Sequence, residues 1–518
     1  MHAHGVTRCV ACPGSRNSPI VASLSAAGTF ELRGATDERS AGFVACGWAA
    51  QAQAPVAVCV TSGSALLNLH PAVAEAYYRH IPLLVISADR PAAWIGQQDG
   101  QTLSQPAIFG GLCRMSVQIP EAPGEQWHRN RLLNEALLEL RHRAGGPVHI
   151  NIPLSEPLFG TSNEPLPSPR IIRRTELARM DADEETELLE IAASCPRRLI
   201  LLGQLPQDAD IPPVLAAEKA FAIIGEHLCN TRIAIRRPDC IIGPHPTKDL
   251  SPDLLITYGG CTISKRLKKL LRDNPPREHW HVSPDGEVVD TFCALTRVIE
   301  GDPAELWELL AAFAEEGDES YAERWLAPIP VPQFPYSGMQ LVGDLLAAMD
   351  EESVLHLANS SAVRFAQLYP LPDSVQVECN RGVNGIEGSL STAIGYAMSA
   401  TRPQFLICGD LSFFYDMNAL WLQGIPPQLH ILLLNNKGGG IFDLIPTPEH
   451  PLVNGAHSAT AADWARSRGF EYISVQGEQD WSAALSALTT PGDRPLLVEA
   501  FTDSTTDAKL LQQFHAQY

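Results

Sequence analysis

The stretch ILLLNNKGGGIF, from Ile431 to Phe442, places two asparagines, a lysine and three glycines directly after an apolar run. Such a segment continues neither a helix nor a strand, because glycine leaves the backbone free and its N–H groups exposed. A plain strand-to-helix turn would need one glycine rather than three. We therefore expect this turn to bind a ligand, with the plain turn as the alternative.

Apolar runs like the one that opens this stretch recur along the chain between helical segments. They are VAVCVTSG (56–63), PLLVISAD (82–89), GPVHINIP (146–153), RLILLGQ (198–204), LLITYGG (254–260), SVLHLANSS (353–361), QFLICGD (404–410), HILLLNN (430–436) and PLLVEAF (495–501). Continuous apolar strands separated by helices indicate parallel sheets that are covered on both faces. The fold class predicted is α/β, with doubly wound parallel sheets.

Two proline-rich and charged stretches, near residues 157–176 and 322–338, interrupt this pattern and are typical of interdomain linkers. They predict three domains, at residues 1–160, 175–325 and 335–518. The first and third share the order strand, Gly-containing turn, helix, Ile-Pro, strand, which indicates an ancient duplication. Two generic βαβ units that match by chance are the alternative.

The composition favours small-molecule chemistry. The 518 residues carry a net charge of −21, which opposes general binding to nucleic acid or to an anionic membrane. The N-terminal residues have no apolar segment of signal-peptide length, and no run of 18 apolar residues follows, so we expect a cytoplasmic protein without membrane insertion. Cys9 and Cys12 have a C-x-x-C spacing without a second pair, which favours reduced core cysteines over a metal site.

Two oxygen-bearing side chains follow neighbouring predicted strands. Asp410 ends QFLICGD and Asn436 ends HILLLNN. A βαβ crossover brings such strand ends together, and a carboxylate with an amide oxygen suits Mg²⁺ bridged to phosphates. The exposed N–H groups of the glycines can then face a diphosphate, and a backbone carbonyl near Gly438 can complete the metal shell.

Gly-Asp followed by about 25 residues and Asn-Asn resembles the magnesium–diphosphate signature of thiamine diphosphate enzymes, in which the aspartate and the second asparagine are ligands. Leu411 stands where many members have a second glycine. The resemblance implies thiamine diphosphate with Mg²⁺, or Mn²⁺, as cofactors, and the thiamine diphosphate-binding fold. The cofactor-binding residues that it implies, besides the metal ligands Asp410, Asn436 and Gly438, are Ser360, Ile386, Gly409, Leu411, Gly439, Gly440, Ile441 and Phe442. Among these, Ile386 matches the apolar residue that bends the cofactor, and Ile441 and Phe442 would form an apolar wall.

More specific motifs occur in order along nearly the entire chain. They are CPGSRNSP (12–19), DERSAGF (37–43), TSGSALLNLHPAV (61–73), SADRP (87–91), SKRL (264–267), NRGVNGIEG (380–388), GDLSFFYDMNAL (409–420) and NNKGGGIF (435–442). Together they are similar to the 2-succinyl-5-enolpyruvyl-6-hydroxy-3-cyclohexene-1-carboxylate synthase family of menaquinone biosynthesis. One departure is Gly100, which replaces the asparagine that in the family often precedes the glutamine found here as Gln101.

Glu38 precedes a small-residue helix, so capping of that helix by Asp37 and Glu38 is one interpretation. The resemblance instead makes Glu38 the carboxylate that activates the aminopyrimidine ring of the cofactor. It further implies a homodimer or a dimer of dimers, because family members build the cofactor site between two subunits.

Several cations stand at predicted strand ends of this acidic chain, where surface solubilisation is the alternative for any single one. Collectively they indicate carboxylate recognition, which suits the arginine fork. By resemblance, isochorismate is contacted by Ser15, Arg16, Arg90, Gln101, Lys265 and Arg266, and the carboxylates from 2-oxoglutarate by Ser360, Arg364 and Arg381. The catalytic residues implied are Glu38, Gln101, Arg364 and Arg381.

The reaction implied is decarboxylation of 2-oxoglutarate and conjugate addition of the succinyl-semialdehyde carbanion to isochorismate, catalysed by a transferase. Another thiamine diphosphate-dependent 2-oxo acid decarboxylase or carboligase is one alternative, but it would not explain Lys265 and Arg266 together with CPGSRNSP. A non-catalytic sensor of the cofactor or of dicarboxylates is the other, and it would not need Glu38.

Overall fold

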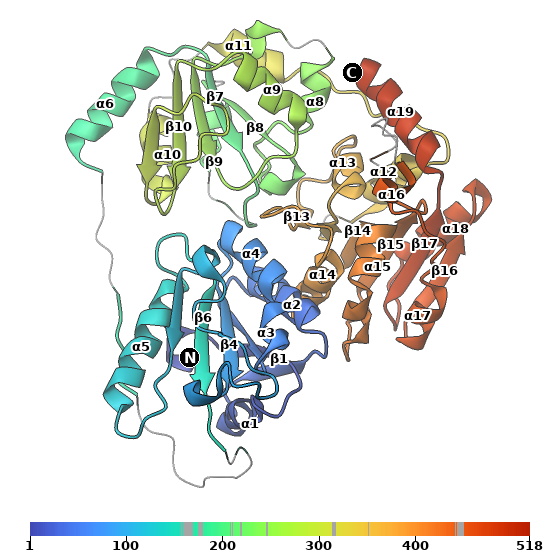
Figure 1. The fold of residues 1–518 in the computed structure, drawn as a ribbon. Coiled ribbons are helices and arrows are strands. Elements are labelled where there is room, and N and C mark those ends of the chain that lie inside the picture. The colour runs from blue at the N-terminus through green and yellow to red at the C-terminus, as the bar shows by residue number, and fades with distance from the viewer. Residues whose placement is uncertain are drawn as a thin grey trace.

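A computed structural model shows three parallel sheets in succession along the chain (Figure 1). It describes the chain except residues 157, 159–168, 175–179, 208, 210, 218–219, 245–246, 313–317, 351, 441, 443–449 and 518. Every strand pairing in the described part is parallel, which confirms the predicted α/β class. The domain boundaries proposed above stay predictions, and most of the linker expected near 157–176 lies outside the described residues.

The first sheet has the strand order β2-β1-β3-β4-β6-β5. Its strands are β1 (Arg8–Ala11), β2 (Glu31–Gly34), β3 (Val56–Val60), β4 (Leu83–Asp89), β5 (Met115–Gln118) and β6 (Val148–Pro153). Its helices are η1 (His2–His4), α1 (Ser18–Ala27), α2 (Glu38–Ala52), α3 (Ser64–Leu67), α4 (His70–Tyr78), η2 (Ala92–Trp94), η3 (Gly110–Leu112) and α5 (Gln126–Glu139). Every residue of β3 and β4 is buried, as expected for strands covered by helices on both faces.

The middle sheet has the order β11-β10-β9-β7-β8. Its strands are β7 (Arg198–Leu202), β8 (Ala222–Gly225), β9 (Leu254–Tyr258), β10 (Glu278–Ser283) and β11 (Arg297–Glu300). Its helices are α6 (Ala182–Ala193), α7 (Val214–Ala217), η4 (His227–Cys229), α8 (Pro238–Ile242), η5 (Lys248–Leu250), α9 (Lys265–Asp273), α10 (Pro303–Ala312) and α11 (Glu319–Trp325). The second predicted linker therefore begins inside α11 and becomes irregular after Trp325.

The third sheet repeats the order of the first, as β13-β12-β14-β15-β17-β16. Its strands are β12 (Val354–Leu357), β13 (Gln376–Cys379), β14 (Gln404–Gly409), β15 (Leu429–Asn435), β16 (Glu471–Val475) and β17 (Leu496–Phe501). Its helices are α12 (Gly338–Ala348), α13 (Ser361–Ala366), α14 (Ser389–Ala397), α15 (Asp410–Tyr415), η6 (Met417–Trp421), α16 (His450–Asn454), α17 (Ala462–Ser467), α18 (Glu478–Leu488) and α19 (Ser504–Gln517). The shared topology supports the duplication inferred from the sequence.

Helices α2 and α14 join the first and third domains, where they lie side by side (Figure 1). A Cβ added to Gly47 would lie 2.0 Å from the Thr392 carbonyl oxygen, and one added to Gly395 would lie 2.1 Å from that of Val44. Glycine at these positions therefore lets the two backbones touch. One hydrophobic core runs through both domains, whereas separate clusters fill the middle domain.

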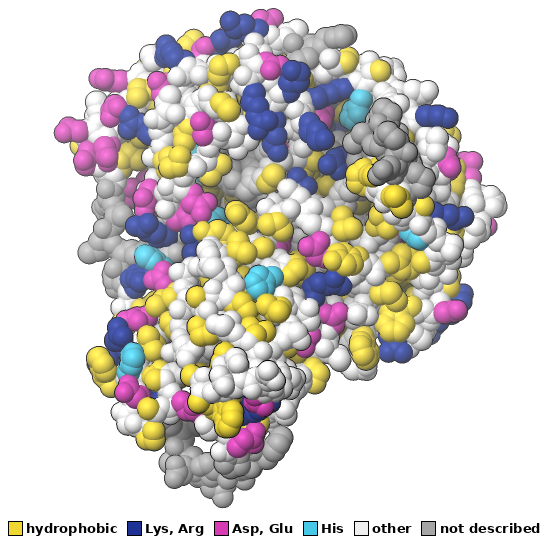
Figure 2. Space-filling view, in the orientation of Figure 1, with side chains coloured by type: hydrophobic (Ala, Val, Ile, Leu, Met, Phe, Trp, Pro, Cys, Tyr) yellow, Lys and Arg dark blue, Asp and Glu magenta, His cyan; other side chains and the backbone are white. Residues whose placement is uncertain are grey.

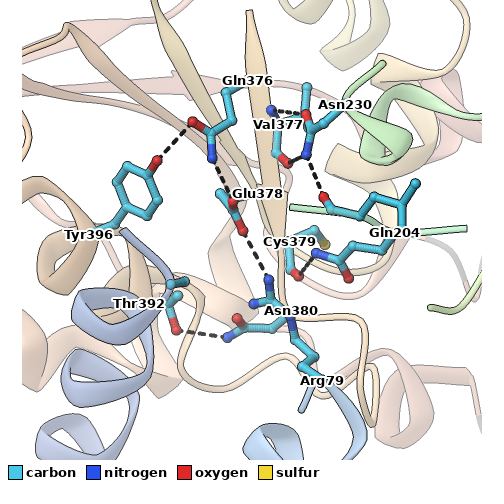
Figure 3. A network of polar contacts seen from close by, with 12 residues as sticks. Arg79, Gln204, Asn230, Gln376, Val377, Glu378, Cys379, Asn380, Thr392 and Tyr396 are labelled. Atoms are coloured by element: carbon cyan, nitrogen blue, oxygen red, sulfur yellow. Dashed lines mark hydrogen bonds and ion pairs between the residues drawn. The ribbon is translucent and has the colours of Figure 1, made fainter. Parts of the chain in front are cut away.

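All three domains meet at the edge strand β13 (Figure 3). Asn230 of the middle domain accepts from the Val377 N–H at 2.8 Å and donates to its carbonyl at 3.0 Å, as a neighbouring strand would. From the first domain, Arg79 donates to Glu378 at 2.9 Å. The strand edge, which otherwise invites pairing with other chains, is thus closed by side chains.

In the part of the chain that the structure describes, every helix is too short or too polar to cross a membrane. The cytoplasmic location expected from the sequence stays a prediction.

Candidate active site

The structure brings Asp410 and the glycine turn together at the carboxyl edge of the third sheet. Strands β14 and β15 pair with Gly409 opposite Leu434, so Asp410 lies beside Asn435, which ends β15, and Asn436 follows directly. The Asp410 side chain is buried, and its Oδ2 accepts from the Gly438 N–H at 3.0 Å. The strand ends that the sequence analysis expected to converge therefore do so.

The surroundings of Asp410 favour a bound cation. Burial raises the pKa of this carboxyl, and N–H groups of Leu411, Gly438 and Lys437 oppose that effect together with His457. The His457 Nε2 lies 3.3 Å from Asp410 Oδ2. A buried carboxylate is costly to keep ionised without a positive partner, so the site suits a metal ion with oxygen ligands.

The two adjacent asparagines have different surroundings. Asn435 is fully buried, and its Nδ2 donates to Glu499 at 2.7 Å and to the Ala459 carbonyl at 3.0 Å. Asn436 is half-buried at the start of the turn. The arrangement therefore leaves the side chain of Asn436, rather than that of Asn435, available as a ligand.

The glycines of the turn are required by close packing. A Cβ on Gly438 would lie 1.9 Å from the Asn454 Oδ1, and one on Gly440 would lie 2.8 Å from the Asn436 Nδ2. The Gly438 carbonyl accepts from the Gly440 N–H at 3.1 Å and keeps a second lone pair. A bare backbone beside a buried carboxylate fits Mg²⁺ and a diphosphate group.

Two of the other residues predicted to bind the cofactor are placed by their contacts. Ser412 of α15 donates to the Ile386 carbonyl at 2.6 Å, which places Ile386 beside that helix. The half-buried Phe442 has a ring carbon 2.8 Å from a Cβ built on Gly439. Ile441 lies outside the described residues.

The side chain of Glu38 does not cap helix α2, which was the alternative to a role in cofactor activation. Asp37 alone caps α2, because its Oδ1 accepts from the N–H groups of Arg39 at 2.9 Å and Ser40 at 3.3 Å. Glu38 accepts from the Asn68 Nδ2 at 3.1 Å. It lines an open pocket of about 440 Å³ together with Thr36, Asp37, Arg39, Asn68 and Trp421. The sequence analysis missed Asn68 as a neighbour of Glu38, although its motif was noted.

The start of α2 contacts the end of α15 in the same chain. Asn418 donates to Asp37 at 2.9 Å, and the Arg39 guanidinium lies 4.4 Å from the centre of the Tyr415 ring. Asp410 stands at the opposite end of this six-residue helix and is not among the residues that line the Glu38 pocket. One chain thus presents the two carboxylates in separate places.

Arg364 and Arg381 form a pair of guanidinium groups in the third domain. Arg364 donates to the Ser360 carbonyl at 2.7 Å, and Arg381 donates to Asn359 Oδ1 at 3.0 Å. Burial and the charge of Arg381 lower the pKa of Arg364. Among the described residues neither makes an ion pair with an acidic side chain. Two close cations without an acidic partner favour an anionic ligand.

The turn before these arginines is strained, since Ser360 has a φ of 75°, which is unusual for a residue other than glycine. Strain of this kind is typical of functional sites, although it does not identify the ligand. Cys261 of the middle domain lies beside the pair, with its Sγ 3.8 Å from the Arg381 Nη2. A cavity of about 800 Å³ at the junction of the three domains reaches Arg381 and Gly382.

The cations assigned to isochorismate in the first domain already contact acidic groups of the chain. Arg16 is buried and donates to the Leu154 carbonyl at 2.9 Å and to Glu156 at 3.1 Å. Arg90 lies 3.5 Å from Asp99. Ser15 and Gln101 are exposed, and Gln101 has a φ of 56°. These residues lie in the loops that follow the strands of the first sheet.

Lys265 and Arg266 begin α9 in the middle domain. Lys265 is exposed, whereas Arg266 donates to the Asp239 carbonyl at 3.3 Å and to the His515 carbonyl of α19. No described contact joins either of them to Arg16 or Arg90. The contacts of Arg266 thus lie in the middle and third domains, whereas those of Arg16 and Arg90 lie within the first.

The chain is similar to known proteins along its whole length. The family model described as "Thiamine pyrophosphate enzyme, N-terminal TPP binding domain" matches residues 1–108. Proteins named 2-succinyl-5-enolpyruvyl-6-hydroxy-3-cyclohexene-1-carboxylate synthase are 48% identical in Bacteroides fragilis, covering 100% of this chain and 97% of the relative, and 35% identical in Cytophaga hutchinsonii, covering 99% and 96%.

A solved structure, the thiamine diphosphate-dependent 4-hydroxybenzoylformate decarboxylase of Rhodococcus jostii RHA1, has the same fold. The two chains superpose with a TM-score of 0.72 over 97% of each, at 19% sequence identity.

Proposed function

Because the chain belongs to the 2-succinyl-5-enolpyruvyl-6-hydroxy-3-cyclohexene-1-carboxylate synthase family of thiamine diphosphate-dependent enzymes, we propose that its substrates are isochorismate and 2-oxoglutarate. The enzyme removes carbon dioxide from 2-oxoglutarate and adds the remaining succinyl-semialdehyde unit to isochorismate. The observation that carries the proposal is the pair Arg364 and Arg381, two guanidinium groups close enough for the charge of Arg381 to lower the pKa of Arg364. Among the described side chains, no carboxylate lies at ion-pair distance from either of them. Such a pair suits a dicarboxylate.

Asp410, Asn436 and the Gly438 carbonyl would hold Mg²⁺, or Mn²⁺ in its place, and the charge of the metal would offset that of the diphosphate. The bare backbone of Gly439 and Gly440 would lie against the diphosphate. Their N–H groups are not exposed as the sequence predicted, because they donate to the Asn454 carbonyl at 2.7 Å and to the Gly438 carbonyl at 3.1 Å. Gly409 and Leu411 flank the metal ligand, and Ile386 with Phe442 would enclose the cofactor rings. Thiamine diphosphate, when bound, supplies the electron sink for decarboxylation.

Glu38 would hold and return the proton of the aminopyrimidine ring, which an open pocket and an uncommitted carboxylate oxygen allow. Ser360, Arg364 and Arg381 would orient 2-oxoglutarate. Isochorismate would be bound by the residues that the family resemblance assigned, which are Ser15, Arg16, Arg90, Gln101, Lys265 and Arg266. Arg16 has an acidic partner of its own, so we expect it to act partly by shaping the loop.

We propose that the active form is a homodimer or a dimer of dimers. Asp410 is not among the residues that line the Glu38 pocket, and a second subunit would bring a complete set together. Exposed apolar side chains surround the Glu38 pocket and α15, namely Leu67, Ile386, Tyr415 and Trp421. Figure 2 shows hydrophobic side chains gathered over the region where the first and third domains meet. An interface of more than about 2,000 Å² is expected.

A product assay tests the proposal. Purified protein is supplied with thiamine diphosphate, Mg²⁺ and 2-oxoglutarate, with or without isochorismate, and both carbon dioxide and the adduct are measured. We expect the adduct only when both substrates are present. Rapid release of carbon dioxide that isochorismate does not alter would indicate a simple decarboxylase, and cofactor binding without turnover would indicate a sensor.

A further inference from the structure

Glu75 is a buried carboxylate that joins the first domain to the loop carrying Arg381. It lies on α4, and 1% of its surface is exposed. Its Oε1 accepts from the Gly382 N–H at 3.0 Å, and its Oε2 accepts from the Val383 N–H at 2.9 Å. The two oxygens therefore hold successive backbone N–H groups across a domain boundary.

Burial of an ionised carboxylate is unfavourable in free energy unless other groups compensate its charge. Burial raises the pKa of Glu75, while Arg79, Arg381 and the two N–H groups oppose the rise. A charge is retained in such surroundings when hydrogen bonds and opposite charges compensate it. The compensation here comes from the segment that follows Arg381 and from Arg381 itself.

Gly382 packs closely against Glu75. A Cβ on Gly382 would lie 2.8 Å from the Glu75 carbonyl oxygen and 3.0 Å from its Oε2. On the other side of the loop, Asn359 donates to the carbonyls of Asn380 at 2.6 Å and Gly385 at 2.7 Å. The loop is thus fixed from both sides, by Glu75 and by Asn359.

The same Asn359 accepts from the Arg381 guanidinium at 3.0 Å. The direction of that guanidinium, and its distance from Arg364, therefore depend on where Glu75 holds Gly382 and Val383. An arginine fork recognises a carboxylate only when its orientation is correct, so a small displacement of this loop weakens recognition.

We propose that Glu75 is a positioning residue that sets Arg381 for the distal carboxylate of the 2-oxo acid, and so contributes to the preference for a dicarboxylic substrate. The inference rests on the proposed function, which supplies the substrate. Glu75 itself touches neither substrate nor cofactor and acts through the loop that it holds.

Glu75→Gln tests the proposal. The amide oxygen can still accept a hydrogen bond from one backbone N–H group, but the NH₂ is a donor and cannot accept from the other. We expect KM for 2-oxoglutarate to rise about tenfold or more with a small change in kcat. Turnover of 2-oxobutyrate, which lacks the distal carboxylate, should be unaffected. Arg381→Lys should also raise KM for 2-oxoglutarate, and the double variant should raise it no further than Arg381→Lys alone.

The matched control is Glu378→Gln, which removes another buried carboxylate at the same junction, the partner of Arg79 in Figure 3. It should lower thermal stability while leaving the ratio of kcat/KM for 2-oxoglutarate to kcat/KM for 2-oxobutyrate unchanged. Glu75→Asp keeps both acceptor oxygens on a shorter stem and should give an intermediate KM, which provides a second variant if Glu75→Gln folds poorly. Two results would overturn the positioning role: an equal loss of kcat/KM with 2-oxoglutarate and with 2-oxobutyrate, or additive effects of the two substitutions on KM in the double variant.

Binding of N-oxalylglycine, an unreactive analogue of 2-oxoglutarate, gives a readout besides turnover. Calorimetry should show about tenfold weaker binding to Glu75→Gln than to the wild-type protein. Wild-type protein that does not bind the analogue would contradict the proposed function. Wild-type protein that binds it, with Glu75→Gln equally tight, would contradict the positioning role alone.

Discussion

Adjacent residues of similar chemistry take different places in this site. Asn435 is buried and bonded to Glu499, while Asn436 stands half-buried at the glycine turn. In the same way Asp37 caps α2, which leaves Glu38 turned toward the pocket. In both pairs the first residue stabilises the backbone and the second is the one that we propose contacts the cofactor.

At the level of single residues, Glu38→Gln should keep cofactor affinity within a few-fold and lower kcat by at least about 100-fold, because an amide still hydrogen-bonds the ring but cannot share its proton. Calorimetry with thiamine diphosphate and steady-state kinetics measure the two effects. Asp37→Ala is the control, since loss of the cap should cost about 1 kcal/mol of stability with turnover preserved. Near-wild-type product formation by Glu38→Gln would exclude the role given to this carboxylate.

Asp410→Ala should abolish Mg²⁺-dependent binding of thiamine diphosphate, because the anionic ligand of the metal is lost. Titration of the cofactor at several Mg²⁺ concentrations checks this expectation. Asp416→Asn, which changes the carboxylate at the other end of α15, should still bind the cofactor. Unchanged affinity in Asp410→Ala would mean that the metal binds elsewhere.

At the level of elements, α2, α14 and α15 form one unit across the first and third domains. Arg39 at the start of α2 donates to the Tyr415 carbonyl at the end of α15. Asp416, directly after α15, accepts from both the N–H and the Oγ of Ser391 in α14, each at 2.7 Å. The position of Glu38 is therefore linked mechanically to the helix that begins at Asp410.

Asp416 makes the stability of the folded protein depend on pH. Burial raises the pKa of its carboxyl to about 6, whereas the unfolded chain titrates near its ordinary value of about 4. Between these values the native state binds more protons than the unfolded state, so this group makes stability fall as the pH rises. Above about pH 7 both states are ionised and the contribution stays constant.

The free energy of unfolding of the wild type, minus that of Asp416→Asn, should therefore decrease by up to about 3 kcal/mol between about pH 4 and about pH 7. Denaturant titrations at each pH measure this difference. Asp463→Asn, at a fully exposed carboxylate, serves as the control for the substitution itself. A flat profile for Asp416→Asn would contradict the buried, proton-binding state of this residue.

At the level of the whole molecule, one chain holds the parts of a site in separate domains. The first domain carries Glu38, the third carries Asp410 and the arginine pair, and the middle domain presents Lys265 and Arg266. Figure 1 shows the middle domain above the other two, with α19 beside α8 and α9. Assembly of two chains is the arrangement by which we propose that these parts meet.

Subunit exchange tests this assembly. Glu38→Gln and Asp410→Ala chains are each expected to be inactive, but a mixture allowed to exchange should recover activity, because one site in each heterodimer would carry neither change. Activity before and after exchange, together with the native mass, measures the effect. Persistent inactivity after verified exchange, or a monomeric mass for active wild type, would show that each site is built within one chain.

Local sequence pattern alone predicted the nine strands with continuous apolar runs, the fold class and the convergence of Asp410 with the glycine turn. These follow from local pattern, since apolar runs of strand length alternate with helices and parallel strands end at one edge. Local pattern missed other strands, among them β5, β8, β10, β11, β13 and β16. The order of motifs also pointed to the family that the relatives show.

Which polar groups are buried, paired or free depends on the tertiary structure. The hydrogen bond between Glu75 and Gly382 joins residues that are 307 positions apart in the sequence. The one between Arg16 and Glu156 spans 140 positions. No local pattern encodes such contacts, because they depend on how whole domains pack. The tertiary structure also decided that Asp37, not Glu38, caps α2 and that Asn435, not Asn436, is enclosed, since burial is a property of the assembled core rather than of a residue and its sequence neighbours.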